Sequence, residues 1–214
     1  METERAVERL IFFTDAVAAI AITLLILPLV ELVTSVAHEK TPPPLGPFLH
    51  ENIPQMFAFA LSFLIIARLW FANHEILADT VRATTTLMWL DIAWVFTIVV
   101  LPLPTEITAV FPTTLLSVTI YICTGFASTL LLSGMSFYLY KHPHLETRGK
   151  ATSAVQVWGI GTTSAAFLLA LVLVLIYPPV GYWSLLLLLL TFPLDLLVKP
   201  RIRRREAARA ARAK

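Results

Sequence analysis

The segment RLIFFTDAVAAIAITLLILPLV, residues 9–30, places an arginine and an aspartate at the start of a long apolar run. After Asp15 the run contains a single polar side chain, Thr23, before Glu31. The apolar segment as a whole extends from about Leu10 to Val36, which exceeds the roughly 20 residues that a helix needs to cross a bilayer. It is also longer than the core of a signal peptide, so we expect a retained membrane helix.

The composition indicates the same environment for the rest of the chain. Of the 214 residues, 57% are hydrophobic and 14% are charged, and the mean hydropathy is +0.79. Soluble domains carry about 25% charged residues. The sequence therefore predicts an integral membrane protein with no separate soluble domain to carry an activity of its own.

Apolar segments recur along the whole chain and predict about six membrane helices, given the length that each span requires. No segment shows the alternation that marks the strands of a membrane barrel, so the predicted class is all-α. The prolines of HEKTPPPLGP, residues 38–47, are expected to break any helix after the first span. The expected spans are Leu10–Val36, Ile53–Ala72, Thr84–Leu103, Thr113–Tyr140, Thr152–Tyr177 and residues 182–198.

The basic residues predict the orientation. Fourteen of the sixteen Lys and Arg residues lie before the first span, in the even-numbered loops or after the last span, whereas the opposite loops hold only Lys40. Under the positive-inside rule both termini are cytoplasmic. We expect a membrane domain over residues 1–200 and a basic cytoplasmic tail over residues 201–214. The tail is expected to contact anionic lipid headgroups rather than nucleic acid.

Several charged residues lie inside the expected spans, where each costs at least ~2.5–3.5 kcal/mol. Arg9, Asp15, Arg68, His74 and Asp91 are expected at one depth, near the cytoplasmic side. We expect a buried cluster of Arg9, Asp15 and His74. For Arg68 and Asp91, a place in this cluster and snorkelling to the interface remain equally open. A further acid, Asp195, is expected to form a surface pair with Lys199.

The sequence contains no motif that indicates an enzyme, a cofactor or a metal centre. It has no HExxH, no cysteine pair, no glycine-rich phosphate loop and no GxSxG. We therefore expect a protein that is not an enzyme and binds neither cofactor nor metal as a resident group.

One face of the first span carries Ile20, Thr23, Leu24 and Leu27, because positions three, four and seven apart share a side of a helix. Glu31 continues this stripe at the end expected to be extracellular, and Pro28 is expected to bend the helix. The pattern is compatible with a pore lining and with ordinary helix packing, and periodicity alone leaves both open.

The segment RLIFFTD resembles the Arg-x-x-x-Phe-Ser-Asp signature of the transmembrane protein 175 family of potassium channels, with Arg9, Phe13, Thr14 and Asp15 at the motif positions. Two later segments are similar to elements of the same family. LWFANHEIL resembles its Trp-x-x-x-His element, at Trp70 and His74, and LPLPT, residues 101–105, resembles the end of its third span. Thr14 stands where the family has serine, and Asp91 stands where it is expected to have asparagine.

This resemblance implies a bacterial member with one six-helix unit per chain, in the plasma membrane, assembled as a homotetramer around a central pore. It implies that the first helix, about residues 10–36, lines the pore and that Ile20, Thr23, Leu24 and Leu27 form the constriction, with Glu31 at the mouth. Arg9, Asp15, Trp70 and His74 would hold that helix against its neighbours, and the permeant ion would be K⁺. One alternative is a structural or assembly protein with no pathway of its own. The other is a secondary transporter coupled to protons or cations. Its usual signs are inverted repeats and helices interrupted at midplane, and no convincing repeat relates residues 1–105 to 106–214.

Overall fold

The computed structural model describes residues 2–37, 42–110, 114–147 and 152–191, together with residues 198, 200 and 202. Within these ranges the regular elements are helices, and the β-type pairing is limited to one isolated bridge between Thr80 and Glu146. Five helical segments of this described part are long and apolar enough to cross a membrane. They are Arg5–Ala37, Ile53–Leu77, Thr85–Ile107, Leu115–Lys141 and Ala154–Ile176. The expected all-α membrane class is confirmed.

The first span consists of two helices, α1 (Glu2–Leu24) and α2 (Leu27–Ala37). They are separated by a turn in which the N–H of Ile26 donates to the carbonyl of Thr23 at 3.4 Å. Pro28 explains the break, because it has no N–H to donate to the carbonyl four residues earlier. The break expected at this proline is confirmed, and it lies just C-terminal to Thr23.

The connection to the second span contains a short helix, α3 (Leu45–Glu51), followed by α4 (Ile53–Leu77). The expectation that the prolines of residues 38–47 exclude any helix is wrong at its C-terminal edge, since α3 includes Pro47. A proline in the first turn of a helix removes an N–H that has no intrahelical partner, so it is tolerated there.

The third span is also built from two helices, α5 (Thr85–Val100) and α6 (Pro102–Val110). The hydroxyl of Thr84 caps α5 by accepting the N–H of Leu87 at 3.3 Å. We expected the span to end at about Leu103, but the helix resumes at Pro102 after a single-residue interruption. The reason is again that proline suits the first position of a helix.

The second half of the chain contains α7 (Leu115–Lys141), the 3₁₀ turn η1 (Pro143–Leu145), α8 (Ala154–Ile176) and the 3₁₀ segment η2 (Pro178–Leu190). η2 is kinked at Gly181, where φ is 48°, a value that favours glycine. It forms the first part of the expected sixth span, whose remainder includes residues 192–197, outside the described residues. Lys40, Asp195, Lys199 and nearly all of the basic tail also lie outside them.

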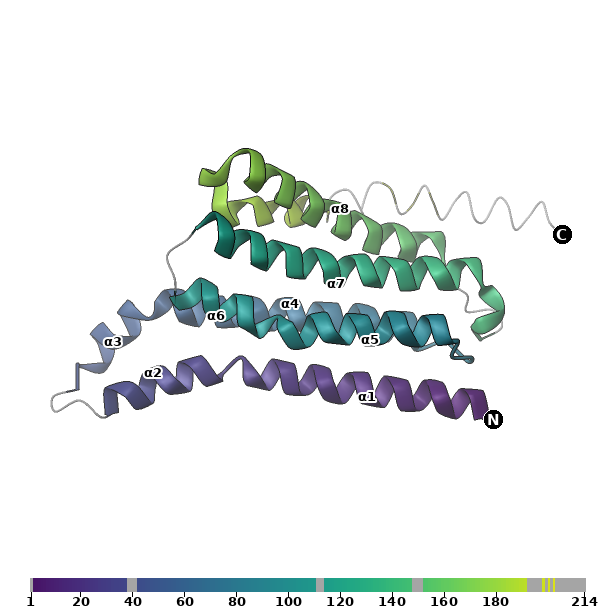
Figure 1. Ribbon diagram of the computed structural model, residues 1–214, viewed down its shortest axis with the longest axis horizontal. Helices are drawn as coiled ribbons and strands as arrows, with labels where there is room; N and C mark the ends of the chain where they lie inside the picture. The colour runs from purple at the N-terminus through teal and green to yellow at the C-terminus, as the bar shows by residue number, and fades with distance from the viewer. Residues whose placement is uncertain are drawn as a thin grey trace.

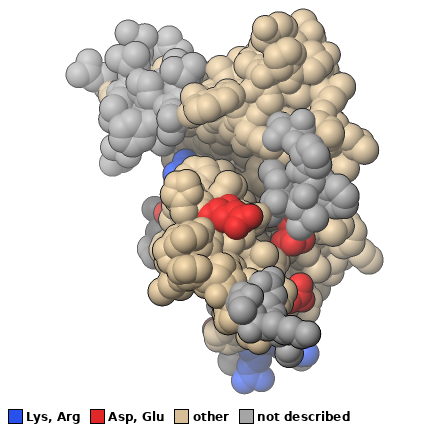
Figure 2. Space-filling model, turned by 90° about the vertical axis from the view of Figure 1, so that its left-hand side faces the viewer, with Lys and Arg blue, Asp and Glu red and all other residues tan. Residues whose placement is uncertain are grey.

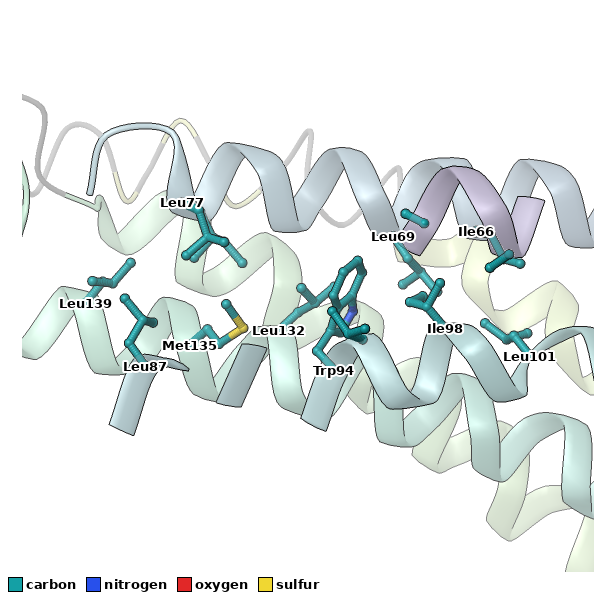
Figure 3. Close-up of a cluster of buried hydrophobic side chains, with 14 of the residues drawn as sticks. Ile66, Leu69, Leu77, Leu87, Trp94, Ile98, Leu101, Leu132, Met135 and Leu139 are labelled. Atoms are coloured by element: carbon teal, nitrogen blue, oxygen red, sulfur yellow. The ribbon is translucent and has the colours of Figure 1, made fainter. Parts of the chain in front are cut away.

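The helices are stacked in layers, with α1 and α2 along one edge of the bundle (Figure 1). The pair of α4 and α5–α6 forms the next layer, α7 follows, and α8 with η2 lies at the opposite edge (Figure 1). The main core lies where α4, α5 and α7 meet (Figure 3). Its largest buried side chains include Ile66, Leu77, Leu87, Trp94, Ile98, Leu132, Met135 and Leu139. A smaller core joins α7, α8 and η2.

Two loops that the positive-inside rule assigns to the same side are hydrogen-bonded to each other. The N–H groups of Val81 and Arg82 donate to the carbonyl of Leu145 at 2.8 Å and 3.2 Å. The N–H of Thr147 donates to the carbonyl of Asp79 at 2.8 Å. The α4–α5 and α7–α8 connections therefore lie at one end of the bundle, as the charge pattern requires.

Candidate pore-lining face of the first helix

α1 buries one face against the rest of the bundle, and the spacing of its buried residues explains this packing. The buried positions recur every three or four residues, which places them on one side of a helix. This side packs against α4 and α5. The buried residues are Val7, Leu10, Thr14, Ala18, Ala21 and Leu25.

The opposite face of α1 is exposed although it is largely apolar. Ile20 is 58% exposed, Leu24 is 44% exposed and Leu27, at the start of α2, is 49% exposed. Thr23 and Glu31 are exposed as well. The predicted stripe therefore does not pack inside the chain. The two helices that carry it, α1 and α2, lie along one edge of the bundle (Figure 1). An exposed apolar face of this kind is covered in the membrane by lipid or by another subunit.

The hydroxyl of Thr23 has a defined orientation. It donates its proton to the carbonyl of Ile20 at 2.8 Å, one turn earlier in the helix. Since this bond uses the proton, the oxygen lone pairs of Thr23 remain available as acceptors beside Ile20. The stripe thus combines bulky apolar side chains with one hydroxyl oxygen that can act as a ligand.

A buried hydrogen-bond network attaches the start of α1 to its neighbours. The hydroxyl of Thr14 donates to Oδ2 of Asp91 on α5 at 2.6 Å. Nδ2 of Asn73 on α4 donates to Oδ1 of the same carboxylate at 2.8 Å. Asp91 is fully buried and Thr14 and Asn73 are each 1% exposed. One carboxylate therefore joins three helices, and both of its oxygens are paired.

A second contact lies one residue further along α1, nearer the surface. Nε1 of Trp70 donates to Oδ1 of Asp15 at 2.7 Å. Nδ1 of His74 lies 3.8 Å from the same oxygen, with side chains 43% and 33% exposed for His74 and Asp15. The rings of Trp70 and His74 are also in contact, with centroids 5.8 Å apart. Asp15 thus accepts a bond from α4 while its neighbour Thr14 donates to α5.

These contacts come from a segment that matches a known family. The model of the family described as endosomal/lysosomal potassium channel TMEM175 matches residues 9–102. This segment is similar to the TMEM175 family. It contains both contacts of α1 just described and the whole exposed stripe of α1.

A relative with an assigned function supports the same relationship over the same share of the chain. A potassium channel of Streptomyces collinus is 33% identical over 97 residues, which make up 45% of this chain and 45% of that protein. The match to this curated relative thus spans a little under half of its length.

Two solved TMEM175 structures show the fold over nearly the whole chain. A TMEM175 homologue from Chamaesiphon minutus, described as a lysosomal potassium-selective channel homologue, has a TM-score of 0.63 at 19% identity, covering 94% of this chain and 98% of that one. A single-residue variant of the potassium channel MtTMEM175, solved with a nanobody fusion, has a TM-score of 0.61 at 18% identity, covering 94% and 93%. The chain is therefore a multi-pass membrane protein with the TMEM175 fold.

The TMEM175 signature residues divide between the two faces of α1. Thr14 and Asp15 contact the neighbouring helices, whereas Arg9 and Phe13 are exposed. Phe13 precedes Ile20 by seven residues and Arg9 precedes it by eleven, so both lie on the side of the exposed stripe. Arg9 therefore does not share the buried face that carries Thr14, although we expected it beside Asp15 and His74. Arg68 is exposed too, whereas Asp91 lies in the buried network.

Asn73 is the residue that the sequence analysis missed. It lies three residues after Trp70, on the same face of α4, and is the donor that pairs the second oxygen of Asp91. An uncharged amide inside an apolar span, three residues from an aromatic of the TMEM175 element, is the signal that would have indicated it. The substitution of aspartate for the asparagine expected at position 91 is thus accommodated by two donors.

Proposed function

We propose that this chain is one subunit of a homotetrameric, potassium-permeable cation channel whose pore is lined by α1 and α2. One observation carries the proposal most directly. α1 is attached to the bundle on one face by packing and by the Asp91 network, while its opposite face exposes the stripe of Ile20, Thr23, Leu24 and Leu27. A helix attached on one side and exposed on the other suits a position around a shared axis.

The similar proteins support K⁺ as the permeant ion. The protein of Streptomyces collinus is named a potassium channel, and both structural neighbours are described as potassium channels or their homologues. The segment of this chain that matches the family model contains the proposed constriction. The same ion is therefore the first candidate for this chain, with passive flux down its electrochemical gradient.

The proposed constriction works by dehydration. Four copies of Ile20 at one level form an apolar ring that loses water easily and therefore closes the pathway to ions, as hydrophobic constrictions do in other channels. The Thr23 oxygens, one turn outward, are the nearest side-chain ligands. Because K⁺ gives up its water more readily than Na⁺, a ring of this type favours K⁺ to a modest degree. Glu31 further out would raise the local concentration of cations.

The orientation that the proposal uses is the one predicted by the charge distribution. Both termini are cytoplasmic in the bacterial plasma membrane, the basic tail contacts anionic headgroups, and the Thr14–Asp91 network lies in the inner half of the bilayer. The hydrogen bonds between the α4–α5 and α7–α8 loops support this arrangement, because they place two basic loops at one end.

Recording single channels from the purified protein in planar bilayers tests this function. Under a tenfold KCl gradient, we expect unitary currents that reverse near the K⁺ equilibrium potential, about 59 mV for one charge. When Na⁺ replaces K⁺ on one side, the reversal potential should shift in the direction expected for a channel that is more permeable to K⁺ than to Na⁺. A secondary transporter would instead give saturable flux without unitary events, and protein that produces no conductance would contradict the channel outright.

A further inference from the structure

A cavity of about 320 Å³ lies behind the α1–α2 break, between that break, α4 and α6. It is on the side of the first span that faces the bundle, away from Ile20. Leu24, Leu25 and Pro28 of the break form one wall, while Ala58 and Phe59 of α4 and Glu106 of α6 contribute the others. Its volume falls within the range of about 300–1,000 Å³ that is typical of small-molecule sites.

The cavity lies at the end of the bundle that is predicted to be extracellular. Figure 2 views this end and shows several acidic side chains among uncharged ones, with Lys and Arg visible only toward its margins. None of the described residues that line the cavity is Lys, Arg or His. Both observations indicate a site whose electrostatic potential favours cations over anions.

Most of the cavity wall is apolar, with Leu25 and Leu29 on one side and Phe59 on another. This surface suits a hydrocarbon or aromatic group, because burial of apolar area is favourable by about 25 cal/mol per Å². A metal ion would bind weakly at such a wall, since alkali and alkaline-earth cations need several oxygen ligands. The occupant is therefore expected to be organic.

Two residues with acceptor oxygens, Gln55 and Glu106, also line the cavity. Oε1 of Gln55 is shielded from solvent and accepts no hydrogen bond from any residue that the structure describes. The carboxylate of Glu106 lines the same cavity, and Glu31 is close enough to interact with it electrostatically. Thr105 adds little, because its hydroxyl already bonds Ser62 and the carbonyl of Leu101, both at 2.9 Å. A buried carbonyl oxygen without a donor is costly, so a ligand with N–H groups would gain by pairing it.

We propose that this cavity is a binding site for small organic monocations. The ammonium group pairs with the carboxylate of Glu106 and, once the side-chain amide of Gln55 rotates toward the cavity, donates to its Oε1. The apolar body packs against Leu25, Leu29 and Phe59. Because Leu24 lines the cavity and also belongs to the exposed stripe, an occupant contacts the helix break directly behind the proposed constriction.

The test measures binding by ¹⁹F NMR, with 4-(trifluoromethyl)benzylammonium as the probe and the neutral 4-(trifluoromethyl)benzyl alcohol as its matched control. The full chain is reconstituted in lipid nanodiscs, and empty nanodiscs give the background. For the wild type we expect saturable broadening of the amine signal and weaker binding of the alcohol. Glu106→Gln should weaken amine binding about tenfold, which is the loss of about 1.4 kcal/mol, and leave alcohol binding unchanged.

A pair of size variants checks the location. Ala58→Phe fills the cavity and should abolish saturable binding of the amine, whereas Ala60→Phe, at an exposed position of the same helix, should leave it unchanged. The proposal is overturned if the wild type gives no saturable amine signal, if Glu106→Gln binds the amine as tightly as the wild type, or if Ala58→Phe retains full binding. Since no current is measured, this result and the test of the channel function fail or succeed separately.

Discussion

Replacing Ile20 by asparagine is expected to raise the single-channel conductance about tenfold and to reduce K⁺ over Na⁺ selectivity. The reason is that four amides at the constriction hold water where four sec-butyl groups exclude it, so an ion crosses without full dehydration. A tenfold increase corresponds to removing about 1.4 kcal/mol from the barrier. The measurement is planar-bilayer recording of the variant in KCl and under K⁺/Na⁺ gradients.

The matched control is Ile176→Asn. Ile176 is 77% exposed at the end of α8, in the layer of the bundle furthest from α1, so it undergoes the same chemical change away from the stripe (Figure 1). We expect wild-type conductance and selectivity for this control. Equal behaviour of the two variants would remove Ile20 from the permeation pathway.

The substitution with the largest expected effect on folding is Asp91→Leu. Leucine branches at the same carbon as aspartate but accepts no hydrogen bond, so the buried donors of Thr14 and Asn73 both lose their partner. Each orphaned donor costs about 1–3 kcal/mol, which predicts a loss of about 2–6 kcal/mol and loosening of α1 from α4 and α5. Thermal unfolding in detergent, followed by circular dichroism and size-exclusion chromatography, measures the effect.

Asp91→Asn provides the control for that substitution. Its amide oxygen accepts one of the two donors, and a flip of the Asn73 amide presents an oxygen to the new NH₂ group, so the network can close again. We expect a melting temperature close to that of the wild type. If Asp91→Leu melted as high as Asp91→Asn, the network would not be what attaches α1.

The membrane class and the spans of the first five segments could be predicted from composition and apolar run length alone. The bend in the first span followed from Pro28, because a missing N–H is a local property of the residue. The errors also arose at prolines. Pro47 was interpreted as a helix breaker, and the third span was expected to end at about Leu103, directly after Pro102. Each proline lies in the first turn of a helix, where proline is compatible with the helical backbone.

The contacts in the N-terminal half of α1 were foreseen only in part. Matching depths along the spans brought Asp15 and His74 together, and the structure places Nδ1 of His74 3.8 Å from Oδ1 of Asp15. Depth does not specify which side of a helix a residue occupies, however, so Arg9 was grouped with a face that it does not share. Asn73 was not predicted because only the charged residues of the spans were considered. Its side chain is a neutral amide whose role depends on Asp91, eighteen residues away.

The central claim is that the exposed face of α1 borders the ion pathway, and thiol accessibility tests it most directly. In a Cys123→Ser background, which removes the native cysteine, Ile20→Cys channels are recorded while Ag⁺ is applied, with Ile176→Cys as the reference. The account predicts rapid, irreversible block of Ile20→Cys and unchanged current for Ile176→Cys. Persistent current through Ile20→Cys channels whose thiol is shown by mass spectrometry to be modified would contradict it.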